Sequence, residues 1–98
     1  MITTSEALQM VSTILAAGRR NDDAAIDAIP DGDVALALYV LESAQTVARQ
    51  DDQAHVEAIH EGMPLTAEDS ERHIAAIRAV DELSGPIATL RSELRARR

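Results

Sequence analysis

The chain has 98 residues, a formal net charge of −8 and no cysteine. This length predicts a single domain with one modest core, and the lack of cysteine excludes disulfides and thiolate metal sites. The N-terminal sequence MITTSEALQM lacks the pattern of a signal peptide, and the longest apolar run, Val34–Leu41, is far too short to span a membrane. We therefore expect a cytoplasmic protein with no membrane partner.

The composition favours an all-α fold. Its apolar residues are mainly Ala, Leu, Ile and Val, and Tyr39 is the only aromatic residue. Strands are usually richer in aromatic and β-branched residues, whereas small aliphatic side chains suit close helix packing.

The first helix is predicted to begin after Thr3, because Thr3 and Glu6 match a capping box. Gly18 is a plausible stop for this helix. Asn21 or Asp22 then caps a short second helix, which ends at Ile29 because a proline follows it.

Asp31 or Asp33 is expected to cap the third helix. The segment Val34–Ala48 is apolar on nearly all sides over its first half, which is typical of a helix buried on several sides, so we place it centrally. Asp51 or Asp52 is expected to start a separate fourth helix that ends near Gly62.

A fifth helix is predicted after Thr66, which forms a capping signature with Asp69. The sequence Ser84-Gly85-Pro86 interrupts it. Pro86 is suited to the first turn of a new helix, but the apolar spacing continues across the break, so a kinked continuation is equally consistent with the pattern.

An internal repeat underlies the predicted architecture. Residues 7–29 align without gaps on residues 37–59 with seven identities, and the pattern suggests a third unit at residues 76–96. Each unit would be a long helix, a tight turn and a short helix. We expect five or six helices in long–short hairpins, packed as a compact bundle or short repeat array, within one domain of residues 1–98.

Two resemblances accompany this pattern. The hairpin units loosely resemble tetratricopeptide-type arrays, without the tetratricopeptide motif residues. The stretch GRRNDDAAIDAIPDGDVALAL looks similar to small uncharacterised helical proteins of actinobacteria and their phages. This second resemblance covers residues 7–45 and implies no activity.

No motif predicts a metal, a cofactor or catalysis. Glu57 and His60 have the spacing of a di-iron helix, but the second such pair is missing. Asp31, Asp33 and Glu42 fit three positions of a calcium loop whose required glycine is replaced by leucine. We expect no enzyme and no concave pocket with converging polar groups.

Charge supplies the candidate binding residues. Residues 1–71 carry −11 and residues 72–98 carry +3. The repeat would align six acidic residues along one edge: Asp22, Asp23, Asp27, Asp51, Asp52 and Glu57. The basic tail, residues 91–98, offers Arg91, Arg95, Arg97 and Arg98. These residues also have an ordinary structural interpretation, as helix caps and as cations near a helix C-terminus.

We therefore expect a non-enzymatic protein–protein interaction module, of a kind that phages and mobile elements encode, which binds a partner protein through its helix faces or acidic edge. One alternative is an acidic decoy that mimics nucleic acid. Another is a self-assembling protein, since a basic tail on an acidic body permits a homodimer. Direct nucleic-acid binding is not expected, because the body is acidic and the tail has no aromatic residue.

Overall fold

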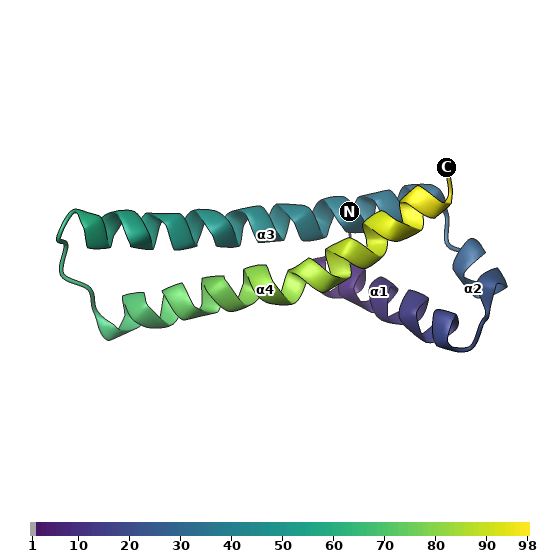
Figure 1. Cartoon of the computed structure of the whole chain (residues 1–98), viewed down its shortest axis with the longest axis horizontal. Helices are drawn as coiled ribbons and strands as arrows, with labels where there is room; N and C mark the ends of the chain where they lie inside the picture. The colour runs from purple at the N-terminus through teal and green to yellow at the C-terminus, as the bar shows by residue number, and fades with distance from the viewer. Residues whose placement is uncertain (1) are drawn as a thin grey trace.

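The structure, a computed structural model, describes residues 2–98. These residues form four helices and no strand: α1 (Thr4–Arg19), α2 (Asp23–Asp27), α3 (Asp31–His60) and α4 (Ala67–Ala96). Figure 1 shows α3 and α4 as a long antiparallel hairpin, with α1 lying across one half and α2 at the far end of that half. The molecule measures 55 × 22 × 21 Å. It is all-α as predicted, but it is elongated rather than a compact bundle.

The predicted fourth helix is not a separate element. Asp51 and Asp52 lie inside α3, which continues for 30 residues without a break. In the first copy of the repeat, Gly18 and Asn21 surround the helix end, whereas the second copy has Ala48 and Asp51 at the aligned positions. Without a residue that favours a turn, extending an existing helix costs less free energy than ending it and nucleating another. The two copies therefore differ in structure, and only the first forms a long–short pair.

The end of α1 depends on Asn21 rather than Gly18. Gly18 is inside the helix, and Asn21 adopts the left-handed conformation with φ of 55°. Asparagine tolerates this region better than most residues. The backbone N–H of Asp22 then donates to the carbonyl of Ala17 at 2.9 Å. Asp22 also accepts a bond from the N–H of Ala25 at 3.2 Å, which confirms it as the cap of α2.

The first residue of α3 is Asp31, and its N-cap is Pro30, which makes no side-chain capping bond. The predicted caps Asp31 and Asp33 are therefore wrong in detail: both lie in the first turn. Acidic residues there are favourable near the positive end of the helix dipole. The carboxylate of Asp31 instead pairs with Arg97 near the end of α4.

Both capping boxes are confirmed. The Thr3 hydroxyl accepts from the N–H of Glu6, and the Glu6 carboxylate accepts from the N–H of Thr3. Thr66 and Asp69 form the same reciprocal pair at the start of α4. The end of α3 near Gly62 is also confirmed, because this glycine adopts φ of 74° directly after the helix.

The Ser84-Gly85-Pro86 sequence bends α4 without ending it, so the kinked continuation is the observed outcome. Figure 1 shows α4 changing direction near its middle. Pro86 has no N–H to donate and its ring crowds the preceding turn. The Ser84 hydroxyl donates to the Val80 carbonyl at 2.9 Å, and the Gln45 amide donates to the same carbonyl at 2.9 Å. Gln45 thus ties α3 to the bend.

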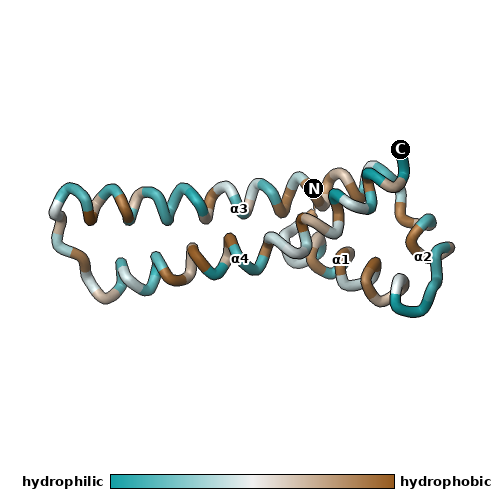
Figure 2. The backbone as a smooth tube through the Cα atoms, in the orientation of Figure 1, coloured by the Kyte–Doolittle hydropathy of each residue, from teal (hydrophilic) through white to brown (hydrophobic). Residues whose placement is uncertain are grey.

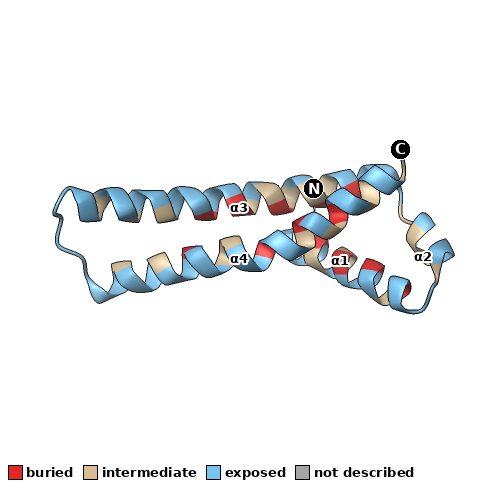
Figure 3. Cartoon of the chain, in the orientation of Figure 1, coloured by how far each residue is buried: buried red, intermediate tan, exposed pale blue. Residues whose placement is uncertain are grey.

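The core lies where α1 crosses the hairpin. Figure 3 shows the buried residues gathered in this half, while the opposite end of the hairpin is mostly exposed. Three helices supply the core cluster: Ala7, Val11, Ile14, Val34, Ala37, Leu41, Leu83, Ile87 and Leu90. The central position of Val34–Ala48 is confirmed, but its burial follows a single stripe, and Tyr39 on its outer side is 62% exposed.

Candidate functional site in the outer arm of the hairpin

The hairpin extends well beyond α1, and we call residues 49–80 the outer arm. The first residues of the chain lie beside the middle of α3, where Ile2 and Thr4 share a shallow groove with Tyr39 and Val47. From there α1 runs toward α2, away from the outer arm (Figure 1). The outer arm is therefore only two helices thick.

The contact between the two helices of the outer arm is unusually polar. Its inward side chains include Asp52 and His55 from α3 and His73 and Ala76 from α4. The rings of His55 and His73 stack with their centroids 4.0 Å apart and an interplanar angle of 13°. The core half of the same hairpin has Leu41 opposite large aliphatic side chains of α4. The outer arm consequently buries much less apolar surface.

Asp52 and His73 form a half-buried pair across this contact. His73 Nδ1 lies 2.9 Å from Asp52 Oδ1, and neither atom has another partner. The two atoms are close without the alignment of a hydrogen bond. Asp52, predicted for an acidic edge, instead faces the other helix.

A shallow pocket of about 240 Å³ opens at the end of the outer arm. Contrary to the expectation from sequence, polar groups converge on it: Asp51, His55, Asp69, Arg72 and His73 line it together with Met63, Pro64 and Leu65. Most of these groups have partners within the fold. The hydrogen bonds from the backbone N–H and hydroxyl of Thr66 hold the pKa of Asp69 below its ordinary value.

Large apolar side chains are exposed along the outer arm. Nine such residues occur in the described chain, and six of them lie between residues 56 and 77: Val56, Ile59, Met63, Leu65, Ile74 and Ile77. Figure 2 shows hydrophobic residues continuing along both helices of this half. Isolated exposed apolar residues are ordinary, but a cluster of them marks an interaction surface.

Four of these side chains form one patch. Ile74 and Ile77 directly follow the inward-facing His73 and Ala76, and Val56 directly follows His55. Each step of one residue rotates the side chain by about 100° around a helix. Because α3 and α4 are antiparallel, the same step turns both sets toward the same side of the hairpin. Ile59, at the open end of the contact, borders them.

We call Val56, Ile59, Ile74 and Ile77 the outer-arm patch. These residues are 41%, 51%, 50% and 49% exposed. None of these four residues lines the groove beside α1, which contains Tyr39 and Val47. None of them lines the end pocket, which contains Ala54 and Arg72. The outer-arm patch is therefore a separate surface with no described residue packed over it.

The acidic residues predicted to share an edge lie in two distant groups. Asp22, Asp23 and Asp27 are at the α2 end, and the second group of Asp51, Asp52 and Glu57 is on the outer arm. Asp51 follows the start of α3 by twenty residues, a distance of about 30 Å along the helix axis. The single acidic edge is not present, because the second copy of the repeat does not form a hairpin.

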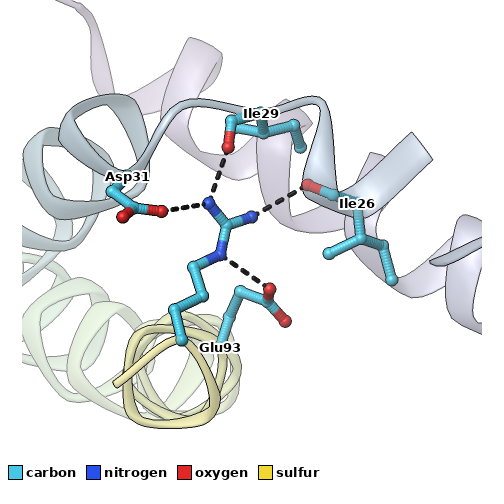
Figure 4. Close-up of polar contacts among 5 residues, drawn as sticks. Ile26, Ile29, Asp31 and Glu93 are labelled. Carbon is cyan, nitrogen blue, oxygen red and sulfur yellow. Dashed lines mark hydrogen bonds and ion pairs between the residues drawn. The ribbon is translucent and has the colours of Figure 1, made fainter. Parts of the chain in front are cut away.

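The basic tail is partly built into the fold. Arg97 Nη1 donates to the Ile29 carbonyl at 2.6 Å and to Asp31 at 2.7 Å, Nη2 donates to the Ile26 carbonyl at 2.8 Å, and Nε donates to Glu93 at 2.9 Å (Figure 4). The hydrogen bonds to Asp31 and Glu93 raise the pKa of Arg97. Its side chain is 13% exposed, so Arg97 acts as a structural clamp.

The other three arginines of the tail are exposed. Arg91 pairs with Glu42 of α3 at 3.2 Å. Arg95 and Arg98 border a small groove beside Leu38. No ion pair of Arg95 or Arg98 occurs among residues 2–98, so these two remain available for a partner.

Metal binding receives no support from the described residues. Within positions 2–98, no three His, Cys, Asp or Glu side chains are arranged to hold an ion. Glu57 and His60 are both exposed near the end of α3. In the same range, no helix has the length and apolarity needed to cross a membrane.

The histidine pair and the outer-arm patch were missed by the sequence analysis. The sequence does contain a signal for both features. His73, Ala76, Val80 and Leu83 are spaced by three, four and three residues, and this spacing defines the side of α4 that faces α3. Ile74 and Ile77 fall beside this stripe and widen it. The predicted break after Ala48 concealed the equivalent stripe of α3.

Comparisons with known proteins give no family for the chain. It matches no protein-family model, and neither curated proteins nor solved structures yield a significant match.

Proposed function

We propose that the chain is a protein–protein interaction module that binds its partner through the outer-arm patch. The observation that carries this proposal is the concentration of exposed large apolar residues in the outer arm, which no third helix among residues 2–98 covers. Burying half-exposed Ile and Val side chains is favourable for association.

The groups in the end pocket support binding rather than catalysis. Asp69 is held by Thr66, His73 faces Asp52, and His55 is stacked on His73. A general acid or base needs to reach a substrate with its proton-carrying atom free. These side chains instead contact one another and connect the two helices, which favours a structural role in keeping the outer arm together.

The acidic-decoy alternative is less well supported. A nucleic-acid mimic needs a continuous run of negative charge, whereas the predicted acidic residues lie in two groups, one at α2 and one on α3 about 30 Å beyond the start of that helix. Asp52 is turned inward toward His73. An apolar patch, rather than a charged edge, is the surface that the fold leaves uncovered.

Site-specific photocrosslinking in living cells of the native host tests the proposal. A photoreactive amino acid at position 77 should give covalent adducts with a partner, because this side chain is 49% exposed within the patch. The matched control places the same amino acid at Leu15, which is 48% exposed on α1. We expect adducts from position 77 that disappear when Ile74→Glu is added, and few from position 15.

The proposal is wrong if positions 77 and 15 give equal adducts, or if Ile74→Glu leaves the position-77 adducts unchanged. Circular dichroism of each variant checks that helicity is retained. Because Ile74 is 50% exposed, the substitution should leave the monomer folded.

A further inference from the structure

We infer that the outer arm is a pH-sensitive element, in which protonation of His55 and His73 draws α3 and α4 together. The inference goes beyond the proposed function and does not depend on it, because it concerns the isolated chain. It is carried by the arrangement of two imidazoles and two carboxylates across the contact between the two helices.

Each helix supplies one histidine and one aspartate to this arrangement. On α3, Asp52 precedes His55 by three residues, and on α4, Asp69 precedes His73 by four residues. Residues at either spacing lie on the same face of a helix. The two imidazoles stack with their centroids 4.0 Å apart. Four ionisable groups therefore share one part of the two-helix contact.

The carboxylates lie across from the histidines of the opposite helix. Asp52 Oδ1 of α3 is 2.9 Å from His73 Nδ1 of α4, and both atoms are shielded from solvent and lack a hydrogen-bond partner. Asp69 of α4 lines the end pocket together with His55 of α3. Hydrogen bonds from Thr66 are the main cause of the low pKa of Asp69, and the positive charge of His55 lowers it further. Each histidine thus faces an aspartate of the other helix, and we call these two contacts the crossed pairs.

Two further charged groups face the histidines. Asp51 of α3 and Arg72 of α4 complete the polar lining of the end pocket, and the loop between the helices adds only Met63, Pro64 and Leu65. The charge of Arg72 is partly offset by Glu68, which lies 3.8 Å away. Negative charges therefore outnumber positive ones around the two rings. Protons added to the rings reduce this imbalance.

Protonation adds an attraction to each crossed pair. A neutral imidazole carries no net charge that a carboxylate could attract, whereas an imidazolium does. Two imidazolium charges repel each other across the stack, so the second proton stabilises the contact less than the first. The closed arm consequently binds protons more tightly than an arm whose helices have moved apart. By linkage, closure is strongest at the acidic end of the range in which histidines titrate, and it weakens as the pH rises through this range.

The outer arm has few other contacts that could mask this effect. Among its residues 49–80, only Ala76 is buried, and no third helix within residues 2–98 packs on it. An ion pair at a partly exposed site changes an equilibrium by only about threefold. Such a factor matters where little apolar surface holds two helices together, which is the situation in the outer arm.

Distances between two spin labels test the inference. The chain has no cysteine, so Gln53→Cys on α3 and Ala75→Cys on α4 place one label on each helix at exposed positions. We expect double electron–electron resonance to show a narrow distance distribution at about pH 5.5 and an additional population of longer distances at about pH 8. This population should be about threefold larger at the higher pH, the factor expected for one partly exposed ion pair.

Substitutions in the labelled chain identify the groups that carry the response. His55→Gln/His73→Gln keeps polar side chains that do not titrate, and it should abolish the difference between the two pH values. His60→Gln is the matched control, because His60 is the third histidine of the chain and is exposed at the end of α3. It should leave the difference unchanged. Asp52→Asn should reduce the difference, because one crossed pair then gains no attraction on protonation.

Equal distance distributions at the two pH values overturn the inference. A broader distribution at the lower pH also overturns it, because repulsion between the rings then dominates. The same holds for a response that survives in His55→Gln/His73→Gln or that Asp52→Asn leaves unchanged. Circular dichroism shows whether each variant retains its helices. If the double histidine variant loses helicity, the comparison of Asp52→Asn with His60→Gln decides between the outcomes.

Discussion

Arg97 and Asp31 lie 66 positions apart in the sequence and 2.7 Å apart in the structure. The same guanidinium donates to the carbonyls of Ile26 and Ile29, which end α2 and precede α3. The turn between these two helices contains Pro30 and has no side-chain cap of its own. Arg97 therefore satisfies backbone groups that the local sequence leaves without partners.

Replacement of Arg97 by alanine should destabilise the protein by about 2–3 kcal/mol, because two partly buried carbonyls and Glu93 lose a charged donor. Lysine should recover less than half of this loss, since it lacks the planar fork of five donors. Urea unfolding monitored by circular dichroism measures both effects.

Two control substitutions separate the carbonyl contacts from the ion pair. Asp31→Ala should cost only about 0.5 kcal/mol, because the Asp31 side chain is 77% exposed and screened by water. Arg98→Ala should change the stability by less than about 0.5 kcal/mol, as expected for an exposed surface residue. Equal losses for Arg97→Ala and Arg98→Ala would contradict the clamp.

Gln45 provides a second test, at the bend of α4. Its amide donates to the Val80 carbonyl at 2.9 Å and to the Ser84 hydroxyl at 3.1 Å. Gln45→Ala should cost about 1–3 kcal/mol through lost packing and lost hydrogen bonds. Gln45→Leu should cost less, since it keeps the volume and the Val80 carbonyl retains the Ser84 hydroxyl. Thermal unfolding should rank Gln45→Ala below Gln45→Leu.

The glycines give predictions of opposite sign. A methyl group added at Gly18 would meet no atom within 4 Å beyond its own helical turn, and Gly18 is helical, so Gly18→Ala should stabilise the protein by about 0.5–1 kcal/mol. Gly62 has φ of 74°, and Gly62→Ala should destabilise it by about 1 kcal/mol through backbone strain. Denaturant midpoints that shift in the same direction for both variants would refute this assignment.

The cap of α4 makes the chain sensitive to acid. Hydrogen bonds from Thr66 lower the pKa of Asp69 from the ordinary value of about 3.9. The stability that the ionised Asp69 carboxylate gives the folded protein is therefore fully present above this ordinary value. It is lost as the pH falls through the lower pKa of the folded state. Carbon-detected NMR titration should show the Asp69 carboxyl titrating below pH 3.9. Thr66→Ala should move this pKa upward, whereas Thr66→Ser should leave it near the wild-type value.

Local signals in the sequence were sufficient to predict the fold class and several helix ends. Both capping boxes depend on residues three positions apart, and Gly62 acts within one turn. Such contacts are determined by nearby residues alone. The central position of Val34–Ala48 was also predicted locally, from apolar residues on nearly all sides of the segment, although only one stripe of it is buried and Tyr39 is 62% exposed.

The number of helices and the site were not predictable in the same way. A pair of aspartates caps a helix at residue 22 but is carried inside one at residue 52, and the difference depends on whether the preceding residues stop the helix. The similarity between RRNDDAAIDAI and RQDDQAHVEAI predicted two equal hairpins, but only the first stretch contains a helix end. The clamp formed by Arg97 is a contact across the fold, which no local pattern specifies.

The polar contact between His55 and His73 also has a consequence for motion. The buried aliphatic residues of the core hold one half of α3 and α4, whereas the other half of the same helices is joined through two imidazoles and an aspartate. Local opening needs less free energy where fewer apolar groups separate. Hydrogen exchange should therefore divide each continuous helix into a slowly exchanging and a rapidly exchanging part, with the border near Gln45. In the monomer the distal segments would separate and close repeatedly while the rest of the protein stays folded.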